Sequence, residues 1–339
     1  MRAIEYTKNG DPDVLTLVER AAAEPGPGEV RVQVHRSGVN PTDWKSRRGS
    51  TAGATVSPAQ VPGQDGAGLI DAVGNGVDAG LLGQRVWIWE AAFQRPNGTM
   101  QELAVVPVQH VVPLPDSSSF DLGAALGIPF LTAHRALTVT EDGPIQLGPG
   151  TLQDRVVLVA GGAGAVGNAA IQLARWSDAT VISTVSSAAK AQAAVAAGAD
   201  HVINYRQQDV VEEIGKLTSH GVNTIVEVSA AANSAIDAAV IAPHGSVAVY
   251  ADDGGSELSL PIRPLMVPNA RWQFVLVYSA PANAKARAVQ DISQALRAGA
   301  IRVGEEVGLP LHHFSLADAA AAHTAVEQSI TGKVLVDVR

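Results

Sequence analysis

A glycine-rich turn is the feature of this sequence whose spacing most directly indicates chemistry. Gly162, Gly164 and Gly167 fit the pattern G-x-G-x-x-G and follow the apolar run 156–160. In such a turn the first glycine permits a tight bend, the second lets backbone approach a pyrophosphate, and the third lets a helix pack against the strand. The N-terminus of that helix offers free N–H groups to the phosphates. The loop therefore predicts a dinucleotide site, and a tight turn without a ligand is the less favoured interpretation.

The residues after the next apolar run indicate which dinucleotide binds. An NAD site usually carries Asp or Glu about 20 residues further on, where the carboxylate accepts from the ribose 2′-hydroxyl. Residues 179–199 contain no acidic residue. Hydroxyl groups and a lysine suit a 2′-phosphate through charge-assisted hydrogen bonds, although Lys190 alone would be interpreted as a solvated helix residue. The sequence therefore favours NADPH, with candidate 2′-phosphate partners Ser183, Ser186, Ser187, Lys190, Tyr205 and Arg206.

Alternating strands and helices are expected to position this loop. Strands are predicted at 156–160, 180–185, 201–204, 224–228, 245–250 and 272–278, and helices at 166–176, 188–197, 210–217 and 233–242. Strands that alternate with helices form βαβ units around a parallel sheet. We therefore expect a doubly wound α/β domain that binds its ligand outside the carboxyl ends of the strands.

The first third of the chain has a different pattern, rich in short strands. Residues 30–34 alternate apolar and polar side chains, and glycines separate the apolar runs that follow. This pattern is typical of a barrel or sandwich. A loop at 113–119 precedes a helix that Ser119 or Asp121 is expected to cap. The segment 283–339 predicts two more helices and a final strand.

Composition excludes several classes of protein. The chain has 339 residues, 46% of them hydrophobic and 17% charged, with a net charge of −9 and no cysteine. At about 100–200 residues per domain this length favours two domains with substantial cores. The net negative charge argues against a nucleic-acid partner, and no apolar run reaches the length of a membrane span. The missing thiols exclude disulfides and thiolate metal sites. We expect a cytoplasmic protein without nucleic-acid or membrane partners.

Four segments then resemble one known family. Segments 38–45 (GVNPTDWK), 62–68 (PGQDGAG), 127–137 (GIPFLTAHRAL) and 161–167 resemble motifs of the medium-chain dehydrogenase/reductase superfamily, in its order and spacing. The similarity is closest to the zinc-free quinone oxidoreductase (zeta-crystallin-like) branch. This resemblance implies a GroES-like β-rich catalytic domain, from residues 1–125 and 281–339, around a Rossmann dinucleotide-binding domain of residues 126–280.

Departures from the zinc-dependent relatives imply a site without metal. Where those relatives have a cysteine this chain has Asn40, and where they have Gly-His-Glu it has Gly63-Gln64-Asp65. His312 and His313 are adjacent, so on a strand they would point to opposite faces. The residues alone leave open a zinc site assembled from histidines and carboxylates across the fold. We expect none.

The resemblance also implies which residues lie at the reaction centre. Asn40, Asp43, Lys45 and Thr132 are the candidate catalytic residues, and Asn40 and Thr132 are expected beside the nicotinamide and ribose. Asp43 has an equally favoured alternative role, which is to cap a helix that begins near residue 42. Lys45 is expected to bind an enolate oxygen or a cofactor phosphate, with a surface lysine as the simpler interpretation. The sequence singles out no proton donor.

Cofactor contacts are expected from both ends of the chain and from the strand ends. The predicted set is Asn40, Thr132, Gly162, Gly164, Ala165, Val166, Gly167, Ser183, Ser186, Lys190, Tyr205, Val228, Tyr250, Ala251, Val275, Leu276 and Lys333. The apolar strand 272–278 is last in its domain. By resemblance it pairs with its twin in a homodimer, which would cover an otherwise exposed sheet edge.

The resulting prediction is hydride transfer from NADPH to a quinone or enone, without zinc. A conjugated acceptor yields a delocalised enolate or a hydroquinone, so it needs less electrophilic assistance than a simple ketone. The protein then mainly holds the reactants together. Two alternatives remain: an enoyl or alkenal double-bond reductase acting on acyl chains, and an NADPH-binding protein with little turnover.

Overall fold

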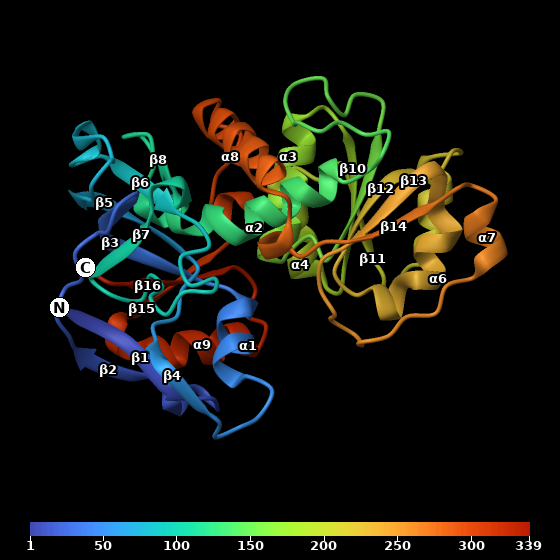
Figure 1. The fold of residues 1–339 in the computed structure, drawn as a ribbon. Coiled ribbons are helices and arrows are strands. Elements are labelled where there is room, and N and C mark those ends of the chain that lie inside the picture. Colours follow the sequence, from blue (N-terminus) through green and yellow to red (C-terminus); the bar gives the residue numbers. More distant parts are fainter. The chain divides into compact units, whose positions relative to one another are not determined.

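The two ends of the chain fold together, and the middle folds separately. The computed structural model describes all residues from Met1 to Arg339. One unit contains Met1–Ile128 and Pro310–Arg339, and the other contains Pro129–Leu309 (Figure 1). Helix α2 (Phe120–Thr138) passes from the first unit into the second.

The first unit is built on a seven-stranded sheet with the order β15-β16-β3-β5-β6-β8, in which β7 also pairs with β3. Its strands are β3 (Glu29–Val39), β5 (Asp65–Val73), β6 (Arg85–Ile88), β7 (Leu103–Pro107), β8 (Val111–Pro113), β15 (Leu311–Ser315) and β16 (Lys333–Asp337). Alternation in β3 places Val30, Val32 and Val34 in the interior. The β-rich pattern expected from the sequence is confirmed.

A smaller antiparallel sheet and two helices complete the first unit. The sheet has the order β2-β1-β4, with β1 (Arg2–Lys8), β2 (Thr16–Glu19) and β4 (Thr55–Gln60), and the helices are α1 (Pro41–Arg48) and α9 (Ala319–Glu327). Ile4 and Tyr6 of β1 share one apolar core with Val334 and Val336 of β16.

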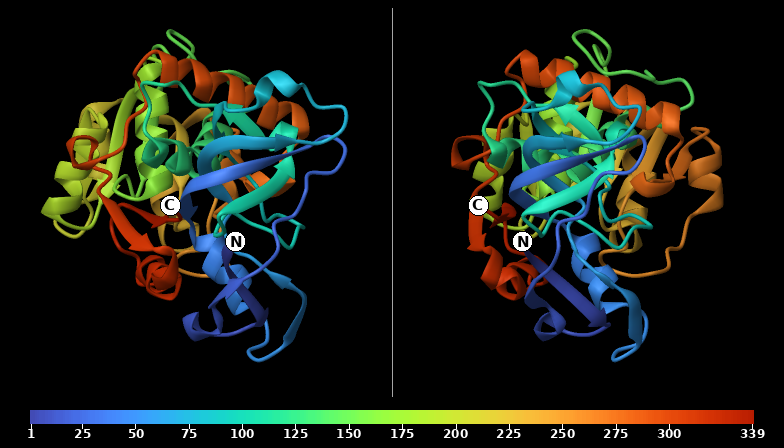
Figure 2. Two further views of the ribbon diagram at one scale, coloured as in Figure 1. Left: turned by 90° about the vertical axis from the view of Figure 1, so that its left-hand side faces the viewer. Right: turned by 60° about the vertical axis from the view of Figure 1, so that its left-hand side comes forward.

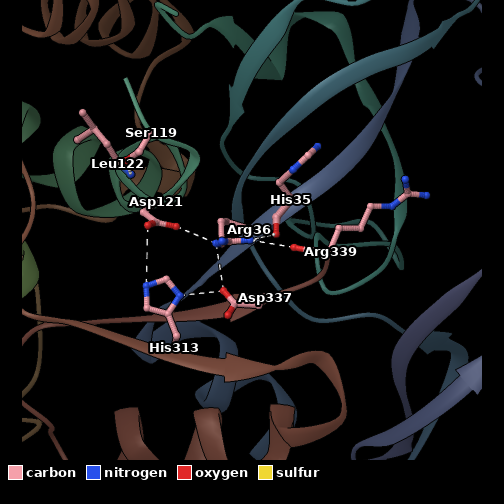
Figure 3. A network of polar contacts seen from close by, with 8 residues as sticks. All are labelled: His35, Arg36, Ser119, Asp121, Leu122, His313, Asp337 and Arg339. Carbon is pink, nitrogen blue, oxygen red and sulfur yellow. Dashed lines mark hydrogen bonds and ion pairs between the residues drawn. The ribbon is translucent and has the colours of Figure 1, made fainter. Parts of the chain in front are cut away.

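The pairing of β16 with β3 joins the two ends of the chain. Val334 lies opposite Val39 in antiparallel register. Both chain ends lie in the first unit (Figure 2). A polar network reinforces this junction (Figure 3): the Arg36 guanidinium lies 2.7 Å from Asp121 and 3.0 Å from Asp337, and His313 Nδ1 lies 2.8 Å from Asp337.

The second unit is a six-stranded sheet in which every pair of neighbours is parallel, in the order β11-β10-β9-β12-β13-β14. Its strands are β9 (Val156–Ala160), β10 (Thr180–Val185), β11 (His201–Asn204), β12 (Val222–Glu227), β13 (Ile241–Val249) and β14 (Arg271–Phe274). Its helices are α3 (Ala165–Trp176), α4 (Ala188–Ala197), α5 (Val210–Leu217), α6 (Ala230–Val240), α7 (Ile262–Met266) and α8 (Ala282–Arg297).

The strand order places the glycine loop at a switch point. The chain moves outward from β9 through β10 to β11, crosses back, and continues from β12 to β14. Right-handed crossovers therefore put α3 and α4 on one face of the sheet and α5 and α6 on the other. The crevice where the direction reverses lies between β9 and β12, which is where such sheets bind ligands. The doubly wound sheet predicted from the sequence is confirmed.

The second unit extends further along the chain than the expected boundary at 280/281. Helix α8 belongs to this unit because Asp291, which is buried, accepts hydrogen bonds from His134 at 2.7 Å and from the Leu147 N–H at 2.7 Å. The segment after α8 is held in the same way, since Asn168 donates to the Val307 carbonyl.

Most predicted elements occur where they were expected. The main exception is β14, the last strand of the second unit. Strand β14 ends at Phe274, and a 3-10 turn at Val277–Ser279 replaces the end of the strand predicted at 272–278. Ser119 caps α2 by accepting from the Leu122 N–H at 3.1 Å. None of the helices combines the length and the apolar character that crossing a lipid bilayer requires.

Candidate active site

The turn from β3 into α1 holds the first group of candidate residues. Asn40 precedes the helix, Pro41 supplies its first residue, and Asp43 lies in its first turn. One Asp43 oxygen accepts from the Asn40 N–H at 2.8 Å, and the other accepts from the Gly63 N–H at 3.1 Å. The capping role that the sequence left open for Asp43 is therefore the one its hydrogen bonds show.

Asn40 links this turn to two buried charges. Its amide nitrogen donates to Asp65 at 2.7 Å, and its amide oxygen accepts from the Lys333 ammonium at 2.7 Å. Lys333 also donates to the Val39 carbonyl at 3.2 Å and lies 3.7 Å from the Asp65 carboxylate. We call Asn40, Asp43, Asp65 and Lys333 the buried polar cluster. All four side chains are at most 3% exposed.

Burial sets the electrostatics of this cluster. It raises the pKa of Asp43 to about 7, helped by the negative charge of Asp65 and opposed by the two backbone N–H donors and Lys333. Burial also raises the pKa of Asp65 and lowers that of Lys333, while their mutual attraction opposes both changes. Asp43 therefore changes its charge near neutral pH, where a group can exchange protons during a reaction.

Asp65 is the member of the cluster that sequence reasoning missed. It was interpreted only as a departure from a zinc motif, although its position in the 62–68 segment was a usable signal. Its second oxygen accepts from the Ile128 N–H at 2.9 Å. A Cβ on Gly127 would overlap this carboxylate, so the glycine of the 127–137 segment makes room for Asp65.

A cavity of about 330 Å³ in the first unit opens beside Asp43. Tyr6, Gln60 and Gln64 also line it, and the walls come from residues 58–62 and 92–96. Cavities that hold small molecules begin at about 300 Å³, so this one has room for a small organic substrate.

Two other candidate catalytic residues lie outside the cluster. Lys45 is exposed on α1, with its ammonium 5.8 Å from the centre of the Trp44 ring. Thr132 is buried in the half of α2 that belongs to the second unit.

The individual glycines of the loop have partly different roles from those predicted. The tight bend occurs at Gly161, with φ of +69°, rather than at Gly162. Gly162 instead makes room for β10, because its Cβ would overlap the Ser183 hydroxyl, and a Cβ on Gly167 would overlap the Gly161 carbonyl. A Cβ on Gly164 would meet only the Gly161 carbonyl oxygen, at 3.4 Å. Packing within the protein therefore does not explain Gly164, whereas a ligand approaching the backbone would.

Gly164 is also the N-cap residue of α3, so Ala165, Val166 and Gly167 form the first turn of the helix. The N–H groups of a first turn have no partner inside the helix. A pyrophosphate beside Gly164 would supply acceptors for them and would meet the positive end of the helix dipole.

Four of the predicted 2′-phosphate partners, Ser186, Ser187, Lys190 and Tyr205, follow the ends of the neighbouring strands β10 and β11. Val185 lies opposite Asn204, so Ser186 and Tyr205 follow on neighbouring strands, and the Tyr205 N–H donates to the Val185 carbonyl at 3.1 Å. Lys190 lies in the first turn of α4, which Ser187 caps. Ser183 differs from its expected role. It is fully buried and donates to the Val159 carbonyl at 3.1 Å, so its hydroxyl stabilises the sheet beneath the glycine loop.

The remaining predicted contacts follow β12, β13 and β14. Val228 follows β12 directly, and Tyr250 and Ala251 follow β13, where the Tyr250 N–H donates to the Glu227 carbonyl at 3.0 Å. Val275 is buried and its N–H donates to the Val249 carbonyl at 2.7 Å, whereas Leu276 is exposed.

A buried pair of carboxyl groups, Glu227 and Asp237, was not foreseen. They line a second cavity of about 290 Å³, entirely within the second unit. Asn233 donates to both Glu227 oxygens, at 3.1 and 3.2 Å. Burial, followed by the charge of Glu227, raises the pKa of Asp237 to about 8. Only the contact between β12 and α6 brings these two acids together, so no sequence motif marked them.

No three His, Asp or Glu side chains gather in a group suited to a metal ion. His312 instead contacts the Thr331 carbonyl at 2.9 Å, and His313 contacts Asp337.

Comparisons with known proteins agree with both units. A family model described as an alcohol dehydrogenase GroES-like domain matches residues 26–116, and one described as a zinc-binding dehydrogenase matches residues 165–295. The chain is 30% identical to the quinone oxidoreductase of Sus scrofa over 340 residues, which cover 99% of this chain and 97% of that one. It is 32% identical to the Homo sapiens quinone oxidoreductase over 261 residues, covering 76% and 75% of the two chains.

Solved structures share the whole fold. The quinone oxidoreductase of Escherichia coli, solved in complex with NADPH, has a TM-score of 0.82 at 26% identity, covering 99% of this chain and all of that one. An NAD-dependent alcohol dehydrogenase has a TM-score of 0.85 at 27% identity, with both chains fully covered.

Proposed function

The chain belongs to the quinone oxidoreductase branch of the medium-chain dehydrogenase/reductase superfamily, and on this basis we propose that it is an NADPH-dependent, zinc-independent reductase of quinones or other conjugated carbonyl compounds. The observation that carries this proposal is the buried polar cluster at a cavity of substrate size.

The carboxyl end of β10 supports NADPH over NADH. One structural neighbour is NAD-dependent and another is solved with NADPH, so the fold alone does not choose between them. At this position the chain has Ser186 and Lys190 and lacks an acidic residue that would repel a 2′-phosphate. The open side of Gly164 and the first turn of α3 fit the pyrophosphate.

The donor set supports a reaction without zinc. The chain has no cysteine. Asn40 stands where the zinc-dependent relatives have a cysteine, and its side chain is hydrogen-bonded to Asp65 and Lys333. A bound NADPH supplies a hydride from nicotinamide C4. The protein needs only to hold the acceptor and manage one proton, because a conjugated acceptor spreads the developing negative charge.

Asp43 is the best placed residue for that proton. It lines the cavity, and its pKa of about 7 leaves both protonation states populated at neutral pH. Asn40, Asp65 and Lys333 act as positioning residues, since their hydrogen bonds hold the α1 turn on which Asp43 lies.

The exposed edge of β14 supports a homodimer. Phe274, the last residue of the edge strand β14, is 72% exposed, and Leu276, two residues beyond it, is 60% exposed. An unpaired edge with large apolar side chains favours pairing with another strand.

Oxidation of NADPH, followed with a panel of acceptors, tests the proposed reaction. We expect NADPH to be oxidised in the presence of 1,4-benzoquinone or a simple enone. NADH serves as the control and should be oxidised much more slowly. A clear preference for crotonyl thioesters would favour the enoyl reductase alternative, whereas NADPH binding without turnover on the whole panel would favour a binding protein. One zinc ion per purified chain would contradict the proposed zinc independence.

A further inference from the structure

Tyr6 carries a hydroxyl group that has no role in the reaction proposed for Asp43. Its ring belongs to the apolar core of the first unit, and the residue is only 7% exposed. Tyr6 lies opposite Gln60 across the β1–β4 pair, and both residues line the 330 Å³ cavity beside Asp43.

Three other polar side chains of this cavity wall have partners within the chain. Asp43 accepts from two backbone N–H groups, Gln60 donates to the Pro58 carbonyl at 2.8 Å, and Gln64 accepts from the Ala92 N–H at 3.2 Å. The Tyr6 hydroxyl forms no hydrogen bond within the chain and is not among its fully buried polar atoms, so it is open to the cavity that the residue lines. A tyrosine hydroxyl next to an apolar core usually has a hydrogen-bond partner, and a ligand in the cavity would supply one.

The surroundings of Tyr6 make it a donor. Burial and the negative charge of Asp43 raise the pKa of its phenol, and the positive charge of Arg47 opposes them only in part. The phenol therefore keeps its proton at neutral pH and can donate a hydrogen bond to an acceptor atom of a ligand.

We propose that Tyr6 donates a hydrogen bond to the carbonyl oxygen of the acceptor bound in this cavity. The proposal rests on the proposed function, because it assigns an oxygen of that same substrate to a residue of the cavity wall. The apolar walls, including Val61, Pro62 and Pro96, suit a neutral ring or short chain with one exposed carbonyl.

The hydrogen bond gains strength during reduction. As hydride from NADPH forms a new C–H bond on the acceptor, the C4–H bond of the cofactor breaks and an electron pair moves onto the carbonyl oxygen. One proton then neutralises that oxygen, leaving NADP⁺ and the reduced acceptor. A donor aimed at an oxygen that becomes negative stabilises the transition state more than the bound substrate.

Tyr6→Phe tests this role, because it removes the hydroxyl and keeps the ring that packs in the core. We expect kcat/KM for 1,4-benzoquinone to fall by about tenfold or more, mainly through kcat. The Kd for NADPH and the Tm should stay at wild-type values. The matched control is Thr7→Val, which removes a hydroxyl from the neighbouring, exposed position on β1 and should leave all three quantities unchanged.

Binding measured without cofactor separates the inference from the proposed function. The probe is 1,4-naphthoquinone, titrated into wild type and Tyr6→Phe in the absence of NADPH. Weaker binding to the variant would support the phenol contact even if wild type oxidised no NADPH with any quinone, a result that would overturn only the proposed reaction. Equal kcat/KM and equal Kd in the two proteins would overturn the role of Tyr6.

Discussion

At the scale of single residues, the ionisation of Asp43 decides how the proposed reaction depends on pH. Reduction consumes a proton, so the protonated carboxyl is the active form. Because burial places the Asp43 pKa at about 7, we expect kcat/KM to fall as the pH rises through 7.

Asp43→Asn keeps a hydrogen-bond acceptor at the start of α1 but has no proton to exchange. We expect kcat/KM to fall by about 100-fold and the inflection near pH 7 to disappear. Steady-state rates between pH 5.5 and 8.5 check this, with circular dichroism to confirm the fold. A variant that kept the wild-type pH profile would assign the inflection to another group.

Lys190 decides the cofactor preference in this interpretation. Lys190→Ala should weaken NADPH binding by about tenfold, as expected for one lost hydrogen bond to a charged group, and should leave NADH binding nearly unchanged. Titration of both cofactors by fluorescence measures the two Kd values. The matched control is Lys216→Ala on α5, where the lysine instead pairs with Glu212 at 2.8 Å. Equal losses for NADPH and NADH would remove Lys190 from the 2′-phosphate site.

At the scale of elements, the packing of β12 against α6 makes the free energy of unfolding depend on pH. The folded protein keeps a proton on Asp237 up to about pH 8, whereas an unfolded aspartate releases it near pH 3.9. The folded state thus binds more protons at this site over this interval, so the contribution of Asp237 to the free energy of unfolding falls as the pH rises from about 4 to 8.

Asp237→Asn removes that dependence, because an amide donates to Glu227 without needing a proton. The free energy of unfolding of the variant minus that of wild type should be about 1–3 kcal/mol larger at pH 8 than at pH 5. Urea unfolding at the two pH values measures this gain. Asp253→Asn, at an exposed position after β13, is the control and should show no such gain. If the difference in unfolding free energy between Asp237→Asn and wild type were the same at both pH values, Asp237 and Glu227 would not hold a shared proton in the folded state.

Elements also show where local sequence reasoning succeeds. Strands β9, β10 and β11 and helices α4 and α5 have the predicted bounds. The buried strand β9 is a continuous apolar run, and Ser187 and Asp209 cap the two helices. Strand β14 was predicted too long because apolar composition continues through Val277, whereas the strand ends at Phe274 and a 3-10 turn follows at Val277–Ser279.

At the scale of the whole molecule, the exposed β14 edge predicts assembly. Phe274→Asp places a charge on that edge and should convert a dimer into a monomer, which light scattering after size-exclusion chromatography would detect. Leu82→Asp makes the same change at an exposed apolar residue of the first unit, 49% exposed, and should leave the dimer intact. A wild-type chain that elutes as a monomer at micromolar concentration would refute the dimer.

Whole-molecule organisation also explains the shift in the domain boundary. The resemblance to the family implied that α8 belongs to the first unit, with the boundary at 280/281. The structure assigns it to the second unit because its Asp291 completes hydrogen bonds with His134 and the Leu147 N–H, residues more than a hundred positions earlier.

By itself, the sequence determined the two kinds of domain, the family and the site of the glycine loop. Each of these depends on local patterns: hydrophobic periodicity, glycine spacing and short motifs. Tertiary structure decided which side chains share an environment. Asp65 and Lys333 meet at Asn40 because β16 pairs with β3, and Tyr6 faces the cavity beside Asp43 because β1 pairs with β4. Burial and proximity between residues far apart in sequence set their pKa values and their partners, and no local pattern encodes either one.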